Sequence, residues 1–263
     1  MKTAKICKEW ELNFNSLQSE DDVSLHKRSY LHYASEHSDF VAAKSWATKW
    51  LLENILPDQP YTCHEYMAGI GVQTVLAQKL FNISKHIVGE LDPECIEHLE
   101  QQEWDVKPIF RLESAQNAIQ FSNDCDLKFL DLPSSSILKI TREWKDCFLP
   151  LFENDPKLVV WTDTSITYHI SIHGEKYRKI LESDKLLTKE DYIRAYSEWL
   201  YKKFGYSIKR AAIRGRNAVY FAAVKGKEET IIKEFPLNEN LNGSGRGLAA
   251  FHLSIFKLNN SFS

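Results

Sequence analysis

Between Tyr61 and Asp163, short apolar runs alternate with amphipathic runs, and few folds are compatible with this alternation. The apolar runs read YTCHEYMA, HIVGEL, KPIFRL, DLKFLDL and KLVVWTD, and the runs between them have the apolar spacing of helices. Strands that alternate with helices form a parallel sheet with helices on both faces. The sequence therefore predicts an α/β fold.

The sequence after this segment predicts a different end to the sheet. A helical pattern over 189–204 stops at Gly205, and two strand patterns follow it, YSIKRAAIRG and NAVYFAAVKG, with a tight turn between them. We therefore expect a mostly parallel sheet of seven strands that ends in an antiparallel hairpin.

The segments on either side of this core are less regular. Asp39 to Leu56 has apolar residues at helical spacing and ends before Pro57, which predicts a helix that packs against the core. We expect an N-terminal helical extension over 1–57, a core over 58–226, and a C-terminal tail over 227–263 for which the pattern predicts no definite structure.

Composition and charge limit the partners and the cellular setting that we expect for the protein. The formal net charge of −3 argues against strong non-specific binding of polyanions, and the longest apolar run, AVYFAAV, is too short to span a membrane. Charges occupy the N-terminal stretch where a signal peptide needs an apolar run. The five cysteines form no CxxC pair, which predicts unpaired thiols, no metal site and a cytoplasmic, reduced setting.

The stretch EYMAGIGVQT joins the first predicted strand to a helical pattern through two glycines. Such a turn can place backbone N–H groups and a helix N-terminus around a ligand, which glycine allows to approach the main chain. A tight connection without a ligand is the alternative interpretation. The candidate binding residues of this turn are Glu65, Met67, Ala68, Gly69 and Gly71.

Polar residues also follow the next predicted strands. Glu90 ends the second strand, where an acid can accept two hydrogen bonds from a ribose diol, and Leu91 follows it. Glu113 and Ser114 follow the third strand, where a carboxylate can accept from an adenine amino group. These positions predict a nucleoside site at the carboxyl edge of the sheet.

The turn also bears on which nucleoside would bind. A dinucleotide site has the pattern GxGxxG, whereas here Thr74 stands in place of the third glycine. Glu65 would repel a diphosphate and attract a cation. S-adenosylmethionine carries a sulfonium and an ammonium and no phosphate, so we expect this cofactor rather than a nicotinamide or flavin dinucleotide.

EYMAGIGVQT, VGELDPECIEHLEQ and the hairpin YSIKRAAIRGRNAVYFAAV resemble class I S-adenosylmethionine-dependent methyltransferases over Tyr61 to Lys225. GELDPECIEHL and DLPSSS are most similar to tRNA guanosine and related RNA methyltransferases. The resemblance implies a Rossmann-like fold and methyl transfer. It implies that Glu65 orders the methionine end of the cofactor, Gly69 and Gly71 admit it, and Glu90 and Glu113 hold the ribose and the adenine.

The same resemblance places the methyl acceptor beside the end of the fourth strand. Asp131, Pro133 and Ser134 would face the acceptor, with Asp131 as a base or an orienting residue. The segment lacks the second proline and the aromatic residue of adenine amino methyltransferases, and the cysteine of carbon-5 pyrimidine methyltransferases.

Basic and aromatic residues suggest a nucleic acid as the acceptor, and the resemblance implies RNA rather than DNA. Six positive charges and no acid lie between Tyr201 and Arg216, a pattern that suits phosphate contacts. A solvated helix end and hairpin would give the same pattern. Two further hypotheses are an inactive methyltransferase-like binding protein and a methyltransferase for a small molecule or a protein. The candidate substrate-binding residues are Lys209, Arg210, Arg214, Arg216, Tyr30 and Tyr33.

Overall fold

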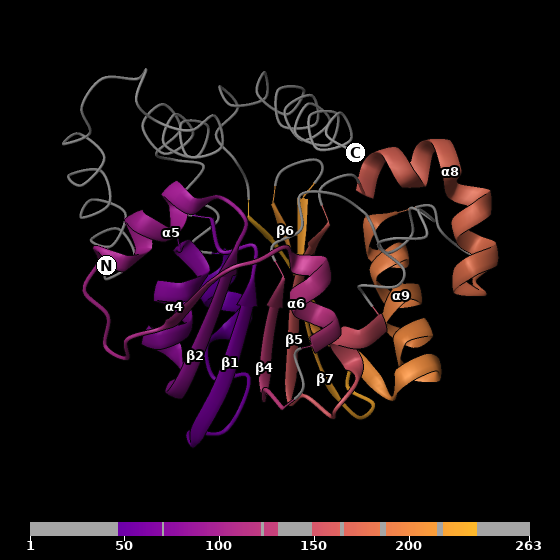
Figure 1. Cartoon of the computed structure of the whole chain (residues 1–263). Coiled ribbons are helices and arrows are strands. Elements are labelled where there is room, and N and C mark those ends of the chain that lie inside the picture. Colours follow the sequence, from indigo (N-terminus) through magenta and orange to yellow (C-terminus); the bar gives the residue numbers. More distant parts are fainter. Residues whose placement is uncertain are drawn as a thin grey trace, which may run out of the picture.

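A computed structural model describes residues 47–69, 71–121, 124–130, 149–163, 166–184, 188–214 and 218–235. Within these ranges the chain forms one mixed sheet with helices on both faces (Figure 1). Residues 47–52 are helical. The elements that follow are β1 (Pro60–Tyr66), α4 (Val72–Leu80), β2 (Asn82–Glu90), α5 (Pro93–Glu100), β3 (Ile109–Leu112), α6 (Ala115–Phe121), β4 (Leu127–Leu130), η2 (Leu149–Phe152), β5 (Leu158–Asp163), α8 (Ile166–Leu181), α9 (Lys189–Phe204), β6 (Tyr206–Arg214), β7 (Ala218–Lys225) and β8 (Ile231–Phe235).

The sheet has the strand order β3-β2-β1-β4-β5-β7-β6-β8. Strands β1 to β5 are parallel to one another, and β7 runs antiparallel to both β5 and β6. This arrangement confirms the predicted α/β fold and its closing hairpin. The order reverses direction at β1 and β4, which is where open parallel sheets bind ligands, outside the carboxyl ends of the strands.

The sheet contains one strand more than the seven that the sequence predicts. β8 pairs in parallel with β6, with Arg210 opposite Ile231, and it lies beyond residue 226, in the part predicted to be a tail. Three of its five residues are exposed and two are half-buried, without strict alternation, which is too short and too weak a pattern to stand out in a sequence. The boundaries between the N-terminal extension, the core and the C-terminal tail, at residues 57 and 226, stay predictions.

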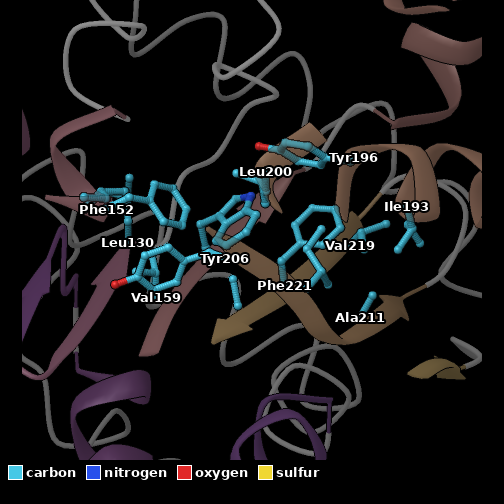
Figure 2. Packing of buried hydrophobic residues seen from close by; sticks show 14 of the residues in the cluster. Leu130, Phe152, Val159, Ile193, Tyr196, Leu200, Tyr206, Ala211, Val219 and Phe221 are labelled. Carbon is cyan, nitrogen blue, oxygen red and sulfur yellow. The ribbon is translucent and has the colours of Figure 1, made fainter. Parts of the chain in front are cut away.

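Two apolar cores stabilise the sheet, one on each face. On one face, side chains from β4, β5, β6, β7 and α9 pack together, among them Leu130, Val159 and Phe221 (Figure 2). The ring of Trp161, in the same cluster, stacks on Phe221 at a centroid distance of 5.1 Å. On the other face, Leu51 of the first helical segment and Ala77 of α4 pack against the strands. The described part of the predicted N-terminal helix therefore lies against the core, as expected.

The pattern of the sequence did not predict α8. This helix packs on α9, where the rings of Tyr177 and Tyr192 lie edge to face at 6.2 Å (Figure 1). Its sequence, ITYHISIHGEKYRKIL, mixes β-branched and polar residues, so its helical period is obscured. Among the cysteines of the described residues, Cys63, Cys95 and Cys125 are buried thiols.

Two features are absent from the described residues. None of the helices in these ranges combines the length and the apolar character that crossing a membrane requires. Nor does any group of three or more His, Cys, Asp or Glu side chains in these ranges have an arrangement that could hold a metal ion.

Candidate functional site

The carboxyl ends of the central strands bring the predicted acids to one edge of the sheet. Tyr66 at the end of β1 pairs with Gly89 of β2, and Glu90 pairs with Leu112 at the end of β3. Glu65, Glu90 and Glu113 therefore lie at the ends of three adjacent parallel strands. The glycine turn leaves β1 at the same edge and leads into α4.

The turn after β1 has an unusual backbone. Met67, Gly69 and Gly71 have φ values of 60°, 57° and 85°, a left-handed conformation that glycine adopts without strain and that costs a side chain such as that of Met67 free energy. The N–H of Ala68 donates to the carbonyl oxygen of Gly89 at 3.1 Å, which fixes the turn to β2.

Gly71 is required for two reasons: its φ is left-handed, and its neighbours leave no room for a side chain. A Cβ atom at this position would lie 2.5 Å from a methyl carbon of Leu99 and 3.4 Å from the ring of Trp104. The side of Gly71 where a Cβ would stand is therefore covered by side chains from α5 and the loop after it. That Gly71 admits a ligand to the main chain stays a prediction.

Glu90 is the residue that holds the turn and the end of β2 together. Its carboxylate is 3% exposed and accepts hydrogen bonds from the N–H groups of Gly69 at 2.6 Å, Leu91 at 2.7 Å and Asp92 at 3.1 Å. Because three main-chain donors fix its oxygens, Glu90 is oriented in advance of any ligand. A ribose hydroxyl would share this carboxylate with the main chain.

Glu65 is buried beneath the glycine turn and takes part in a polar network. Its Oε2 accepts a hydrogen bond of 2.5 Å from the hydroxyl of Thr74 and lies 3.8 Å from Nε2 of His86. Burial lowers the pKa of His86 to about 4, so this imidazole is neutral at neutral pH. Gln78, which lies 3.2 Å from Nδ1 of His86, extends the network to the main chain of Val106.

Glu113 follows β3 and lies against the neighbouring strands. Its Oε1 is 3.7 Å from Nε2 of His64 and 4.0 Å from the guanidinium of Arg111. Burial first, and then the charge of Arg111, lower the pKa of His64 to about 3, so the contact with His64 joins a carboxylate to a neutral ring. Within the described residues this buried oxygen has no hydrogen-bond partner, which suits an incoming donor.

Two exposed leucines lie beside these acids. Leu91 directly follows Glu90 and is 54% exposed, and Leu112 at the end of β3 is 61% exposed. Apolar surface next to carboxylates is what a flat base with an amino group would contact. Ser114, also predicted to bind the cofactor, instead accepts a hydrogen bond of 3.3 Å from the N–H of Asn117 and caps α6.

Two arginines that were predicted to bind phosphates make contacts inside the protein. Arg210 donates to the carbonyl oxygens of Trp50 at 2.8 Å and Glu53 at 2.7 Å, at the end of the first helical segment. Arg214 is 4% exposed and lies over the ring of Tyr220 at 5.3 Å. These contacts hold both guanidinium groups against the protein, and the expectation that the two residues bind phosphates stays a prediction.

Lys209 is the remaining basic candidate in β6. It is half-buried and lies where the register between β6 and β7 shifts, between Ile208 and Arg210. The other candidates lie outside the described residues. They are Tyr30, Tyr33, Asp131, Pro133, Ser134 and Arg216.

Sequence reasoning missed three buried polar residues at this edge. His64 and His86 lie on β1 and β2, inside runs that read as ordinary strands, and no spacing distinguished them. Gln73 lies in the first turn of α4 and is 2% exposed. Its place two residues after Gly71 was the only signal that could have identified it.

The chain is similar to several solved structures. Trm1 from Pyrococcus horikoshii, solved with S-adenosyl-L-methionine, has a TM-score of 0.52 and 10% identity, over 72% of this chain and 56% of that one. An S-adenosylmethionine-dependent methyltransferase from Clostridium acetobutylicum has a TM-score of 0.49 and 13% identity, over 76% of this chain and 98% of that one. The small RNA methyltransferase HEN1 has a TM-score of 0.48 and 12% identity, over 71% of this chain and 26% of that one.

No protein-family model matches the sequence, and no curated protein matches it either. At the low identity of the structural matches, the likeness is one of fold alone. Together with the strand order, it shows that the chain has the Rossmann-like fold of class I S-adenosylmethionine-dependent methyltransferases.

Proposed function

We propose that this protein is an S-adenosylmethionine-dependent methyltransferase. The observation that carries the proposal is the row of acids, Glu65, Glu90 and Glu113, at the ends of adjacent strands around the glycine turn. The ammonium, the ribose diol and the adenine amino group of this cofactor are all hydrogen-bond donors, and a carboxylate accepts from each. A diphosphate would be repelled by the same row.

The side chains and main chain at this edge fit such a ligand. Glu113 offers a buried oxygen without a hydrogen-bond partner among the described residues, which an amino group could satisfy. The first turn of α4 carries no acid, and none of the described side chains caps its N-terminus. Its N–H groups and partial positive charge would therefore suit the carboxylate of the cofactor.

The cofactor would supply an electrophilic methyl group, and the protein would align the acceptor with it. Such a displacement depends mainly on positioning, with a base only where the acceptor loses a proton. Asp131 follows the buried Leu130 at the end of β4, which is adjacent to β1 at the same edge. We assign to Asp131 the role of base or orienting residue, with Pro133 and Ser134 beside it.

For the acceptor we propose RNA, in preference to DNA. The support is the resemblance of GELDPECIEHL and DLPSSS to RNA methyltransferases. A small molecule or a protein is the second candidate. The internal contacts of Arg210 and Arg214 favour it, because they remove two charges from the predicted phosphate-binding surface.

Calorimetric titration with S-adenosylmethionine and S-adenosylhomocysteine tests the cofactor, with NADH as the control. We expect binding of the first two only, and loss of that binding in Glu90→Ala. Binding of NADH alone, or unchanged affinity in Glu90→Ala, would contradict the assignment.

Transfer of a labelled methyl group to RNA, DNA, protein and small-molecule pools tests the acceptor. We expect labelled RNA, loss of label in Asp131→Ala with cofactor binding retained, and RNA binding that weakens steeply with salt. Label in the protein or small-molecule pool alone would select the second candidate. Cofactor binding without transfer to any pool would favour an inactive binding protein.

A further inference from the structure

Gln73 is a buried amide whose hydrogen-bonding groups are not used within the described protein. The side chain is 2% exposed, and neither its Oε1 nor its Nε2 has a hydrogen-bond partner in the part of the chain that the structure describes. A buried amide without partners is costly, and folded proteins contain few of them. Such a group is expected where a ligand supplies the missing partners.

The position of Gln73 on α4 sets the direction of its side chain. In a helix the Cα–Cβ bond tilts toward the N-terminus, so a residue in the first turn covers the N-terminal end of the helix. Ala77, one turn later on the same side of α4, packs against the strands in the core cluster that contains Cys63 and Leu127. Gln73 is therefore on the side of α4 that faces the sheet, at the end of the helix next to the glycine turn.

Three different polar groups meet at this end of α4. The first hydrogen bond of the helix runs from the N–H of Val75 to the carbonyl oxygen of Gly71 at 3.0 Å, so the earlier N–H groups have no partner within the helix. Thr74, the next residue after Gln73, holds the carboxylate of Glu65 at 2.5 Å. The end of α4 thus combines N–H donors, a buried carboxylate and the amide of Gln73.

A zwitterionic α-amino acid group is complementary to this combination. Its ammonium can donate to the Oε1 of an amide while its carboxylate accepts from the Nε2 of the same amide, because the charged groups of an α-amino acid lie side by side. The ammonium is also attracted by Glu65, and the carboxylate by the N-terminus of α4.

From this arrangement we infer that Gln73 binds the amino-acid group of the ligand at the glycine turn and makes the site selective for nucleosides that carry an intact amino acid. The inference rests on the proposed function, since it concerns the methionine end of the same cofactor. Residues other than Gln73 would bind the nucleoside end of the cofactor, so binding of the amino-acid end and of the nucleoside end can be tested separately.

The substitution Gln73→Met keeps the length of the side chain and removes both polar groups. The two ligands are S-adenosylhomocysteine and 5′-methylthioadenosine, which has the nucleoside and the thioether but no amino acid. Calorimetry should show that the affinity for S-adenosylhomocysteine falls about 10- to 100-fold, as for lost hydrogen bonds to charged groups. The affinity for 5′-methylthioadenosine should stay within about twofold, since this ligand does not reach the amide.

Gln78→Met is the matched control on the same helix. Unlike Gln73, the amide of Gln78 has hydrogen-bond partners among the described residues: it donates to the carbonyl oxygen of Val106 at 2.7 Å and accepts from the N–H of Val106 at 3.2 Å. We expect Gln78→Met to lower the urea midpoint of unfolding and to leave the ratio of the two affinities unchanged. Gln73→Met should leave the midpoint unchanged or raise it, because it removes an unsatisfied buried group.

Each other outcome overturns the inference. Unchanged affinity for both ligands would mean that Gln73 does not touch the cofactor, and an unchanged cofactor affinity with weaker RNA binding would place its amide on the acceptor. An equal loss for both ligands would mean that Gln73 shapes the fold of the site. If the unsubstituted protein binds neither ligand, the proposed function itself fails, which the other outcomes do not imply.

Discussion

The carboxylate of Glu90 accepts a hydrogen bond of 2.6 Å from the main-chain N–H of Gly69, which lies on the other side of the turn that joins β1 to α4. This bond joins the end of β2 to the glycine turn, and two more N–H groups, of Leu91 and Asp92, orient the same carboxylate. One acid thus shapes the turn that it would share with a ligand.

Removing Glu90 should therefore affect stability as well as binding. In Glu90→Ala three buried or half-buried N–H groups lose their acceptor, and we expect the free energy of unfolding to fall by about 1–3 kcal/mol. Urea unfolding measures this. Glu97→Ala, an exposed position on α5, is the control and should change the free energy by less than about 0.5 kcal/mol. Equal effects of the two substitutions would contradict the role of Glu90.

Thr74 should be required for its hydroxyl and not for its shape. Thr74→Val keeps the branched side chain but takes a donor away from the buried carboxylate of Glu65, so we expect a loss of about 1–3 kcal/mol of stability. Thr74→Ser keeps the hydroxyl and should recover most of this loss. If Val and Ser at this position have the same thermal midpoint, the hydrogen bond to Glu65 contributes nothing.

The two buried histidines should make the protein sensitive to acid. Burial lowers the pKa of His64 to about 3 and of His86 to about 4, below the 6.5 of an unperturbed histidine. The unfolded chain therefore binds protons that the folded chain does not, and stability falls as the pH drops from about 6.5 toward 4.

Each histidine contributes up to about 1.4 kcal/mol per pH unit to this slope. Urea unfolding between pH 7 and pH 4 measures it. His64→Phe can still stack on Tyr66, whose ring centroid lies 4.2 Å from that of His64, and should make the pH dependence shallower. An equally steep dependence in His64→Phe would show that His64 is not the group that titrates.

Arg210 should contribute to folding and not to nucleic-acid binding. Its guanidinium donates to the carbonyl oxygens of Trp50 and Glu53, so Arg210→Ala should destabilise the protein by about 1.5–3 kcal/mol by freeing the end of the first helical segment. The salt dependence of RNA binding should not change. Lys203→Ala, at an exposed position on α9, is the matched loss of charge and should leave stability unaltered. A shallower salt dependence in Arg210→Ala would restore its predicted phosphate contact.

The sequence by itself determined the α/β class, the parallel strands, the closing hairpin and the edge at which the acids gather. These follow from local patterns: apolar runs alternate with helical ones, glycines mark the turn after β1, and the carboxyl ends of parallel strands necessarily meet at one edge. Glu65, Glu90 and Glu113 could be predicted for this reason, since each directly ends or follows a recognisable strand.

Only the tertiary structure decided what the side chains contact. Arg210 follows a basic stretch in the sequence, but its partners lie about 160 residues away, at Trp50 and Glu53, and no local pattern can place them. Leu99 fills the space beside Gly71, and β8 finds its place only because β6 offers a free edge. The amide of Gln73 is exceptional for the same reason, because burial and the lack of a partner arise when α4 packs on the sheet.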